Sequence, residues 1–253
     1  MAADLLEELL RSRPGLAPVL ARSEWHEVQI RYTQIDRDAQ GVPHFRTHAY
    51  RVDPAAYFYP ASTLKIAGAA LALEKLSQLD LPGLDQHTPL RIGSAFSGQV
   101  AVLHDFSAPG GKPSIAHYLR KLFVVSDNDA YNRLYEFVGQ QRLNEALWEK
   151  GYRDLRLTHR LSTPFTAEEN RHTNPFTFYR DGQVIYQQPP ACNAHTWRAP
   201  APILRGKEHW EQGKWVAGPE DFAGRNYMSL EVMQELLKAC SSPRRYRPGG
   251  ALP

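Results

Sequence analysis

A serine and a lysine three residues apart open the longest apolar run of the chain. Behind Ser62 and Lys65, apolar or small residues fill the stretch from Ile66 to Leu73. This composition predicts a helix that is buried all round, and the spacing places both side chains on one face near its start. A hydroxyl there lies in the positive potential of the helix N-terminus, and a partly desolvated lysine can act as a base. The pair has the chemistry of an activated serine nucleophile, although a helix cap beside a solvated lysine is the alternative.

A second motif, Ser126-Asp127-Asn128, falls between two predicted helices. All three residue types cap helices well, so the triplet alone is also typical of a structural turn. Together, a Ser-x-x-Lys motif opening a buried helix and a later Ser-Asp-Asn motif resemble the penicillin-recognising serine hydrolases, which include the class A β-lactamases and the D-Ala-D-Ala peptidases. The resemblance covers about residues 1–152 and includes Ala130, Asn132, Leu134, Gly139, Leu143, Asn144, Leu147, Gly151 and Tyr152.

The resemblance implies a role for each residue of the two motifs. Ser62 would be the acylated nucleophile, and Lys65 the group that takes its proton, although the base for acylation is disputed in such enzymes. Ser126 would relay this proton to the leaving nitrogen. Asn128 would hydrogen-bond the amide of the substrate, and Asp127 would order the turn.

These roles imply a penicillin-binding serine hydrolase of the antibiotic-resistance type, which opens a β-lactam amide through an acyl-enzyme and needs no metal and no cofactor. A D-alanyl peptidase or another acyl hydrolase on the same scaffold is one alternative. A catalytically inactive binding or structural relative is the other. The expected partner is a small-molecule or peptidoglycan-like acyl substrate, and the protein is expected to be a monomer.

Two glutamates are candidates for the base that hydrolyses the acyl-enzyme. Class A β-lactamases hold this base in a Glu-x-x-x-Asn arrangement on a loop after the second motif. Here the loop offers Glu168 and Glu169, but His172 and Thr173 stand four residues beyond them. Both glutamates stay candidate catalytic residues, with a solvated acidic loop as the alternative, because geometry must decide.

The third motif of the family, Lys-Thr-Gly on a late strand, does not occur after Ser126. That strand supplies one N–H of the oxyanion hole, and the strands around it complete the sheet. Residues 241–253 are instead rich in Pro, Arg and Gly. We therefore expect a truncated or frameshifted product whose C-terminal strands are reduced or missing, with marginal stability and weak activity.

The elements that must position these motifs follow from local patterns. Alternating apolar residues over 27–36 and 44–52 predict a β-hairpin, and Asp181-Gly182 predicts the turn of a second hairpin over 177–187. Helices are expected at 3–22 with a break at Pro14-Gly15, at 62–79, from Ser114, from Asp129, at 141–150 and from Ser229, whereas 188–225 shows no clear period.

The resemblance then implies a mixed α/β fold of the β-lactamase type, with a helical part and an antiparallel sheet built from both chain ends. Residues 1–240 would form a single domain. Its parts would be an N-terminal helix and hairpin (1–55), a mainly helical part (56–225) and a last helix (226–240), followed by an irregular tail at 241–253 that need not be native.

Composition limits the remaining function classes. A hydrophobic content of 42% and a charged content of 23% are ordinary for a globular protein, and a net charge of +3 is too small to indicate nucleic-acid binding. No apolar run is long enough to span a membrane, and the acidic start is not a signal peptide. The resemblance implies a periplasmic or secreted enzyme whose leader is absent from this chain, with a cytoplasmic location as the alternative.

Cysteine and histidine usage gives no metal signal. The two cysteines, Cys192 and Cys240, are too few for a disulfide framework, so free thiols are expected and a single bridge is the alternative. The ten histidines are scattered, and none shows zinc-ligand spacing to a cysteine or carboxylate.

Overall fold

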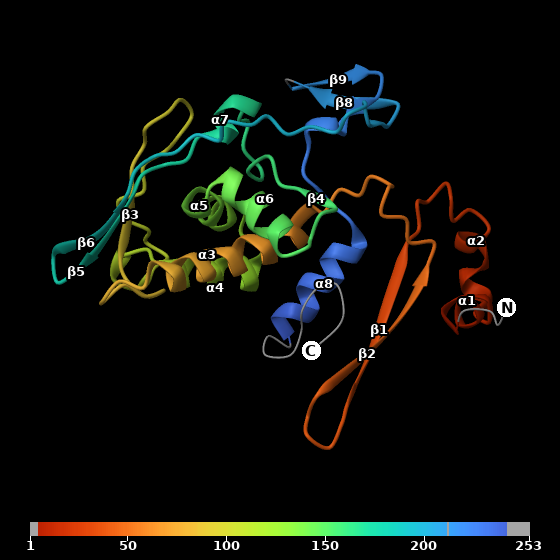
Figure 1. Cartoon of the computed structure of the whole chain (residues 1–253). Helices are drawn as coiled ribbons and strands as arrows, with labels where there is room; N and C mark the ends of the chain where they lie inside the picture. The colour runs from red at the N-terminus through yellow and green to blue at the C-terminus, as the bar shows by residue number, and fades with distance from the viewer. Residues whose placement is uncertain (1–4, 212, 242–253) are drawn as a thin grey trace. The chain divides into compact units, whose positions relative to one another are not determined.

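The computed structural model describes residues 5–211 and 213–241. Its contacts divide the chain into two compact units (Figure 1). The first unit lies within Met1–Phe58 and Met228–Pro253, and the second is Tyr59–Tyr227. The expected single domain and its division into an N-terminal helix and hairpin, a mainly helical middle and a last helix stay predictions.

The first unit begins with short helices and continues into a long hairpin. The helical segment breaks where Pro14-Gly15 predicted it, because proline lacks the N–H that would continue the helix. Strands β1 and β2 pair antiparallel from Ile30↔Tyr50 to Arg37↔Pro43, so the first predicted hairpin is confirmed. The elements are α1 (Leu5–Arg11), η1 (Pro14–Leu16), α2 (Ala17–Leu20), β1 (Ile30–Arg37), β2 (Pro43–Tyr50) and α8 (Leu230–Ser241).

Ion pairs between charged side chains connect helix α8 to the hairpin. Ser229 caps it by accepting a hydrogen bond from the Val232 N–H at 3.2 Å, as the predicted helix start requires. The guanidinium of Arg31 on β1 contacts Glu231 at 2.6 Å and Glu235 at 2.9 Å. These ion pairs join residues from the two ends of the chain within one unit.

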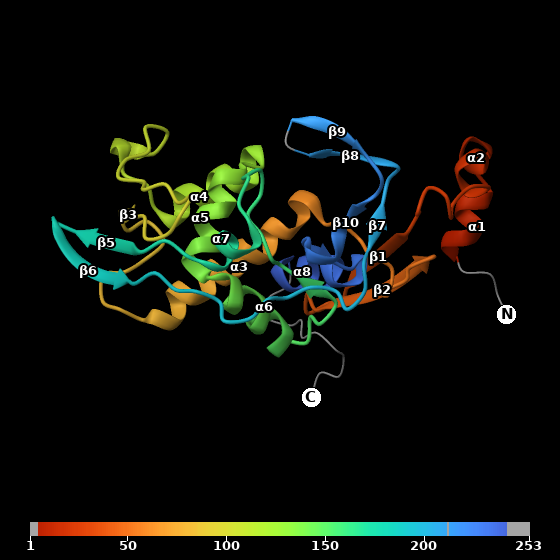
Figure 2. The ribbon, with the colours of Figure 1, turned by 90° about the horizontal axis from the view of Figure 1, so that it is seen from above.

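The second unit is built around four packed helices. Figure 2 shows α3, α4 and α5 lying together, and α6 follows α5 directly. The approach of α3 to α5 requires a glycine, since a Cβ at Gly68 would lie 2.9 Å from the Tyr131 ring. The elements are η2 (Ala61–Leu64), α3 (Lys65–Leu79), η3 (Pro109–Gly111), α4 (Ile115–Val125), α5 (Asn128–Val138), α6 (Gln140–Glu149), α7 (Ala167–Arg171) and η4 (Phe222–Gly224).

Helix α3 ends at Leu79, as predicted, but it is not buried on every side. Leu73 is 41% exposed, and Glu74 forms an ion pair of 2.8 Å with Lys150 on the outer side of the helix. The prediction of a helix buried all round was therefore wrong. The apolar run includes a solvent-facing side because the packed neighbours α4, α5 and α6 do not enclose the whole helix.

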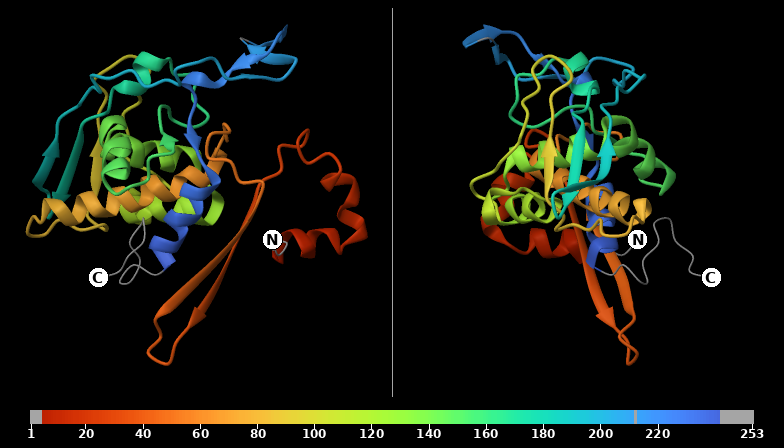
Figure 3. Two further views of the ribbon diagram at one scale, coloured as in Figure 1. Left: turned by 45° about the vertical axis from the view of Figure 1, so that its right-hand side comes forward. Right: turned by 90° about the vertical axis from the view of Figure 1, so that its left-hand side faces the viewer.

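The strands of the second unit form small antiparallel sheets. The three-stranded sheet has the order β3-β5-β6 and appears as yellow and teal strands side by side (Figure 3). Its β5–β6 turn is the second predicted hairpin, and Asp181 and Gly182 both have positive φ, of 50° and 80°. The strands are β3 (Leu90–Ile92), β4 (Leu155–Arg156), β5 (Phe176–Arg180), β6 (Gln183–Gln188), β7 (Leu204–Arg205), β8 (Glu208–Glu211), β9 (Lys214–Ala217) and β10 (Glu220–Asp221), with β11 (Tyr227–Met228) at the unit boundary.

The coarse fold class is confirmed, because helices combine with antiparallel strands. The described sheets are smaller than the expected antiparallel sheet built from both chain ends. In the described ranges 5–211 and 213–241, each sheet has two or three strands, and β1 and β2 form a two-stranded sheet. Within the same ranges, no helix combines the length and the hydropathy that crossing a membrane requires.

Candidate active site

The two sequence motifs meet at the amine of Lys65. Its Nζ donates a hydrogen bond to Ser126 Oγ at 3.0 Å and another to Asn128 Oδ1 at 2.7 Å, and it also contacts the Ser126 carbonyl. Lys65 is the first residue of α3 and only 3% exposed. The fold therefore brings one residue of the first motif into contact with two residues of the second.

The junction of α4 and α5 aims the second motif at this amine. Ser126 ends α4 in the left-handed region, with φ 54°, and reverses the chain direction. Asp127 then caps α5 by accepting a hydrogen bond from the Ala130 N–H at 2.8 Å. Asn128 is the first residue of α5. The cap fixes the start of α5, and the role of each residue of this motif stays a prediction.

Ser62 lies on the short helix η2, one turn before Lys65. It is exposed, and the preceding Ala61 has a φ of 44° in the left-handed region. Among the hydrogen bonds of the described residues, none joins the Ser62 hydroxyl to Lys65, whose amine points to Ser126 and Asn128 instead. The convergence of Ser62 with these side chains stays a prediction.

Burial adjusts the acidity of the lysine. Desolvation lowers the pKa of Lys65 below its ordinary value, and the nearby charge of Asp127 opposes part of this shift. A lowered pKa raises the fraction of neutral amine, which can accept a proton. A neutral amine 3.0 Å from the Ser126 hydroxyl can also exchange a proton with it.

One further residue, Ser162, lies beside the site without any indication in the sequence. The Asn128 Nδ2 donates a hydrogen bond to Ser162 Oγ at 2.7 Å, so the Asn128 amide bridges Lys65 and Ser162. Ser162 lies in a polar loop with no motif around it, and no local signal could have identified it. Ser162 has a φ of 52°, so three of the seven non-glycine residues with positive φ in the described ranges, Ala61, Ser126 and Ser162, lie at or beside the two motifs. Such backbone strain gathers at functional sites.

The two candidate glutamates contact other groups. Glu169 accepts hydrogen bonds from the Thr166 N–H at 2.8 Å and from the Ser97 hydroxyl at 3.1 Å. The backbone hydrogen bond from Thr166 is the main cause that lowers the pKa of Glu169, and a lower pKa makes a weaker base. Glu168 contacts Arg171 and His172. None of these contacts includes Lys65, and the role of either glutamate as a hydrolytic base stays a prediction.

One hollow on the second unit lies away from the motifs. It measures about 570 Å³ and is lined by residues beside β3 and the β5–β6 turn, among them Asp85, Arg91 and Arg180. Ser62 and Lys65 do not line it. The candidate site is therefore defined by its hydrogen bonds and not by the depth of a cavity.

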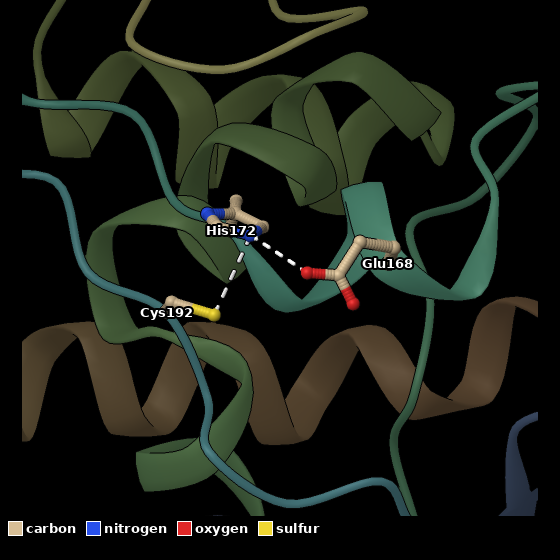
Figure 4. Close-up of side chains that lie close together, drawn as sticks. All are labelled: Glu168, His172 and Cys192. Carbon is tan, nitrogen blue, oxygen red and sulfur yellow. Dashed lines mark hydrogen bonds and ion pairs between the residues drawn. The ribbon is translucent and has the colours of Figure 1, made fainter.

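Three side chains of types that bind metal ions lie close together, although the histidine spacing in the sequence did not indicate a metal site. Glu168, His172 and Cys192 bring a carboxylate oxygen, an imidazole nitrogen and a sulfur within 4.8 Å of one another (Figure 4). Cys192 and Cys240 are both free thiols. Sequence spacing placed Glu168 four residues before His172 but could not identify the whole group, because Cys192 reaches His172 through a tertiary contact.

Comparison with known proteins gives one match. A family model described as Beta-lactamase2, Beta-lactamase enzyme family, matches residues 18–194. The matched stretch is more than half of the chain and contains both the Ser62–Lys65 and the Ser126–Asn128 motifs. No curated protein and no solved structure matches the chain.

Proposed function

The chain belongs to the β-lactamase enzyme family, and from this membership we propose that it is a serine hydrolase of the class A type that opens a β-lactam amide through a Ser62 acyl-enzyme. The observation that carries the proposal is the contact of the Lys65 amine with Ser126 and Asn128. A buried lysine whose pKa is lowered by desolvation, and whose amine is hydrogen-bonded to a hydroxyl, is suited to proton transfer.

The proposed acylation step moves one proton through the site. Ser62 Oγ attacks the lactam carbonyl carbon while its proton passes to the neutral Lys65 amine. The C–N bond then breaks, Ser126 gives its proton to the leaving nitrogen, and Lys65 replaces the proton on Ser126. Asn128 has an amide that can hydrogen-bond the side-chain amide of the substrate. The products of this step are the Ser62 ester and the neutral amine of the opened ring, whose nitrogen carries the transferred proton.

Deacylation is the step for which the site provides the fewest suitable catalytic groups. A base must remove a proton from the attacking water, and Glu168 and Glu169 are the proposed candidates. The Glu169 carboxylate accepts hydrogen bonds from Thr166 and Ser97. The Glu168 carboxylate contacts Arg171 and His172. We expect the acyl-enzyme to be hydrolysed slowly, which would also suit a D-alanyl peptidase that retains penicillin as an adduct. Family membership further supports a periplasmic or secreted location.

The test combines turnover with a mass measurement. The purified full chain is mixed with the chromogenic β-lactam nitrocefin, and its intact mass is recorded after penicillin addition. Turnover supports the β-lactamase, and a stable adduct located at Ser62 supports the peptidase-like alternative. The Ser62→Ala variant is the control and should show neither. Absence of both turnover and adduct in the native chain would overturn the proposal and leave the inactive relative.

A further inference from the structure

Three ligand-type side chains converge beside α7, outside the group around Lys65. His172 Nε2 lies 3.0 Å from Glu168 Oε1 and 3.5 Å from Cys192 Sγ, and Figure 4 shows both side chains directed at the imidazole. We propose that Glu168, His172 and Cys192 bind a borderline-soft divalent cation of the zinc class, with water completing the coordination. This site does not depend on any chemistry at Ser62.

The spacing of the three atoms fits such an ion. Zinc binds imidazole nitrogen and carboxylate oxygen at about 2.0–2.2 Å and thiolate sulfur at about 2.3 Å, so tetrahedral ligand atoms lie about 3.3–3.6 Å apart. Two separations, 3.0 Å and 3.5 Å, are close to these values, and all three atoms lie within 4.8 Å of one another. The Glu168 side chain is 54% exposed and free to make the remaining adjustment.

The backbone holds His172 and Cys192 face to face. They form an isolated antiparallel bridge, flanked by hydrogen bonds from Thr173 N to Ala191 O at 2.8 Å and from Asn193 N to Arg171 O at 3.0 Å. Residues opposite each other between such bonds form the non-hydrogen-bonded type of pair, in which side chains are closest. Backbone pairing therefore brings the sulfur and the nitrogen together before any ion binds.

Neighbouring groups fix the other two parts of the site. Glu168 lies on α7, and His172 is the extended residue that directly follows this helix, with its Nε2 3.0 Å from Glu168 Oε1. The Phe96 ring stacks on the His172 imidazole at 3.6 Å between centroids and 3° between planes, and this contact sets the ring plane. Arg171 binds Glu168 Oε2 at 2.6 Å and the Asn193 carbonyl, so Oε1 is left for the ion. Such outer contacts orient metal ligands.

The geometry favours an ion over a thiol nucleophile activated through the imidazole. A Cys-His-Glu relay would use both ring nitrogens, one facing the thiol and the other the carboxylate. Here Glu168 Oε1 and Cys192 Sγ both approach Nε2. A nitrogen that lies close to both a sulfur and an oxygen is the arrangement expected when all three atoms bind one metal ion.

The site is open to solvent, which leaves room for water as a ligand. Cys192 and Glu168 are exposed, and the His172 side chain is 22% exposed. Three protein ligands with an open position are typical of accessible zinc sites. Binding forms a metal–sulfur bond and releases the thiol proton to solvent, so the step requires no oxidant or reductant.

The experiment uses the metal-free full chain and two probe ions. Zn²⁺ affinity and stoichiometry are measured by competition with a chromophoric chelator, and Co²⁺ is added to detect thiolate-to-metal charge-transfer absorption. We expect one ion per chain and a thiolate band. Cys192→Ser should abolish the band, and Cys192→Ser and His172→Gln should each weaken Zn²⁺ binding by at least about tenfold. Cys240→Ser is the matched control, because it removes the other free thiol and should change neither readout.

Two results would overturn the proposal. One is absence of Zn²⁺ binding or of the thiolate band in the native chain. The other is unchanged affinity and stoichiometry in Cys192→Ser. Circular dichroism of each variant without metal checks that folding is intact, and folding is expected to persist because Cys192 is exposed. None of these readouts uses β-lactam turnover, so failure here is distinguishable from failure of the proposed hydrolase.

Discussion

At the scale of single residues, the chemistry depends on how one lysine is held. Lys65 is buried, its pKa is lowered by desolvation, and its hydrogen bonds lead to Ser126 and Asn128. A lysine that only stabilised the helix start would extend its amine into water, as long cationic side chains generally do. The buried amine is therefore the strongest single indication of a reactive site.

Lys65→Arg should separate charge from proton transfer. Arginine keeps the positive charge but does not give up a proton at working pH. We expect acylation of Ser62 by penicillin to fall by at least about 100-fold, the lower end of general-base contributions. The measurement is the rate of adduct formation by intact-mass spectrometry, with a melting curve to show that the variant is folded. A rate near that of the native chain would mean that another group takes the proton.

Asp105 should make stability depend on acid pH. Burial alone would raise its pKa, but hydrogen bonds from the Ser107 hydroxyl and N–H, the contact with His117 and the charge of Lys121 lower it to about 2. Because this lies below the unfolded value of 3.8, the stabilisation is complete above the unfolded pKa and is lost as pH falls through about 2. Asp105→Asn should cost about 1–3 kcal/mol near neutral pH, where it removes these charge-assisted bonds.

Urea unfolding near neutral pH and again close to pH 2 checks this expectation. The difference between the native chain and Asp105→Asn should shrink at the lower pH, because the native carboxyl is then about half protonated. Asp181→Asn changes an exposed aspartate in the β5–β6 turn and serves as the control. A cost that is equal at both pH values would contradict the argument.

At the scale of elements, a buried arginine joins α5 to the segment that contains α7. Arg160 Nε donates to Glu136 Oε1 at 2.8 Å, and its Nη atoms donate to the carbonyls of Glu169 at 3.1 Å and His172 at 2.8 Å. The arginine side chain is 1% exposed and the Glu136 side chain 3%. These contacts hold the backbone at Glu169, one of the candidate glutamates, and at His172, one of the proposed metal ligands.

Arg160→Met should destabilise the second unit strongly. It leaves the buried Glu136 carboxylate with fewer partners, and breaking a buried pair costs about 3–5 kcal/mol. Arg142→Met is the matched control, since the Arg142–Glu149 pair on α6 is exposed and should contribute less than about 1 kcal/mol. Urea unfolding of both variants gives the comparison. Similar free energies of unfolding would show that the Arg160 contacts contribute little.

At the scale of the whole molecule, the two chain ends fold into one unit. Arg31 on β1 contacts Glu231, Gln234 and Glu235 on α8, and its side chain is 12% exposed. The separation along the chain is about 200 residues. Closing so long a loop costs chain entropy, which these contacts and the packing of α8 must offset.

Arg31→Met should loosen this unit. Two ion pairs and one hydrogen bond are lost from a mostly buried position, and we expect faster amide hydrogen exchange in β1, β2 and α8. Arg11→Met removes an exposed ion pair of α1 with Glu7 and should leave these amides unchanged. The measurement is native-state exchange followed by mass spectrometry. Equal exchange in Arg31→Met and the native chain would contradict this role.

The sequence by itself determined the features that depend on neighbours in the chain. The break at Pro14-Gly15, the cap at Ser114 and the turn at Asp181-Gly182 all lie where local chemistry predicted them. Each is decided by backbone restriction or by a hydrogen bond across three residues, which sequence displays directly. The hairpin of β8 and β9 was missed, since Glu208–Glu211 lacks the alternation that marks a half-buried strand.

Only the tertiary structure decided which distant side chains meet. The two motifs suggested that Lys65 and Ser126 belong together, but the position of Ser162 beside Asn128 had no signal in the sequence. In the sequence Cys192 has no partner nearby, and only the backbone pairing of the folded chain places it beside His172. The physical reason is that such contacts arise from the packing of whole elements against one another. Spacing along the chain records only which residues share a turn, a strand or a helix face.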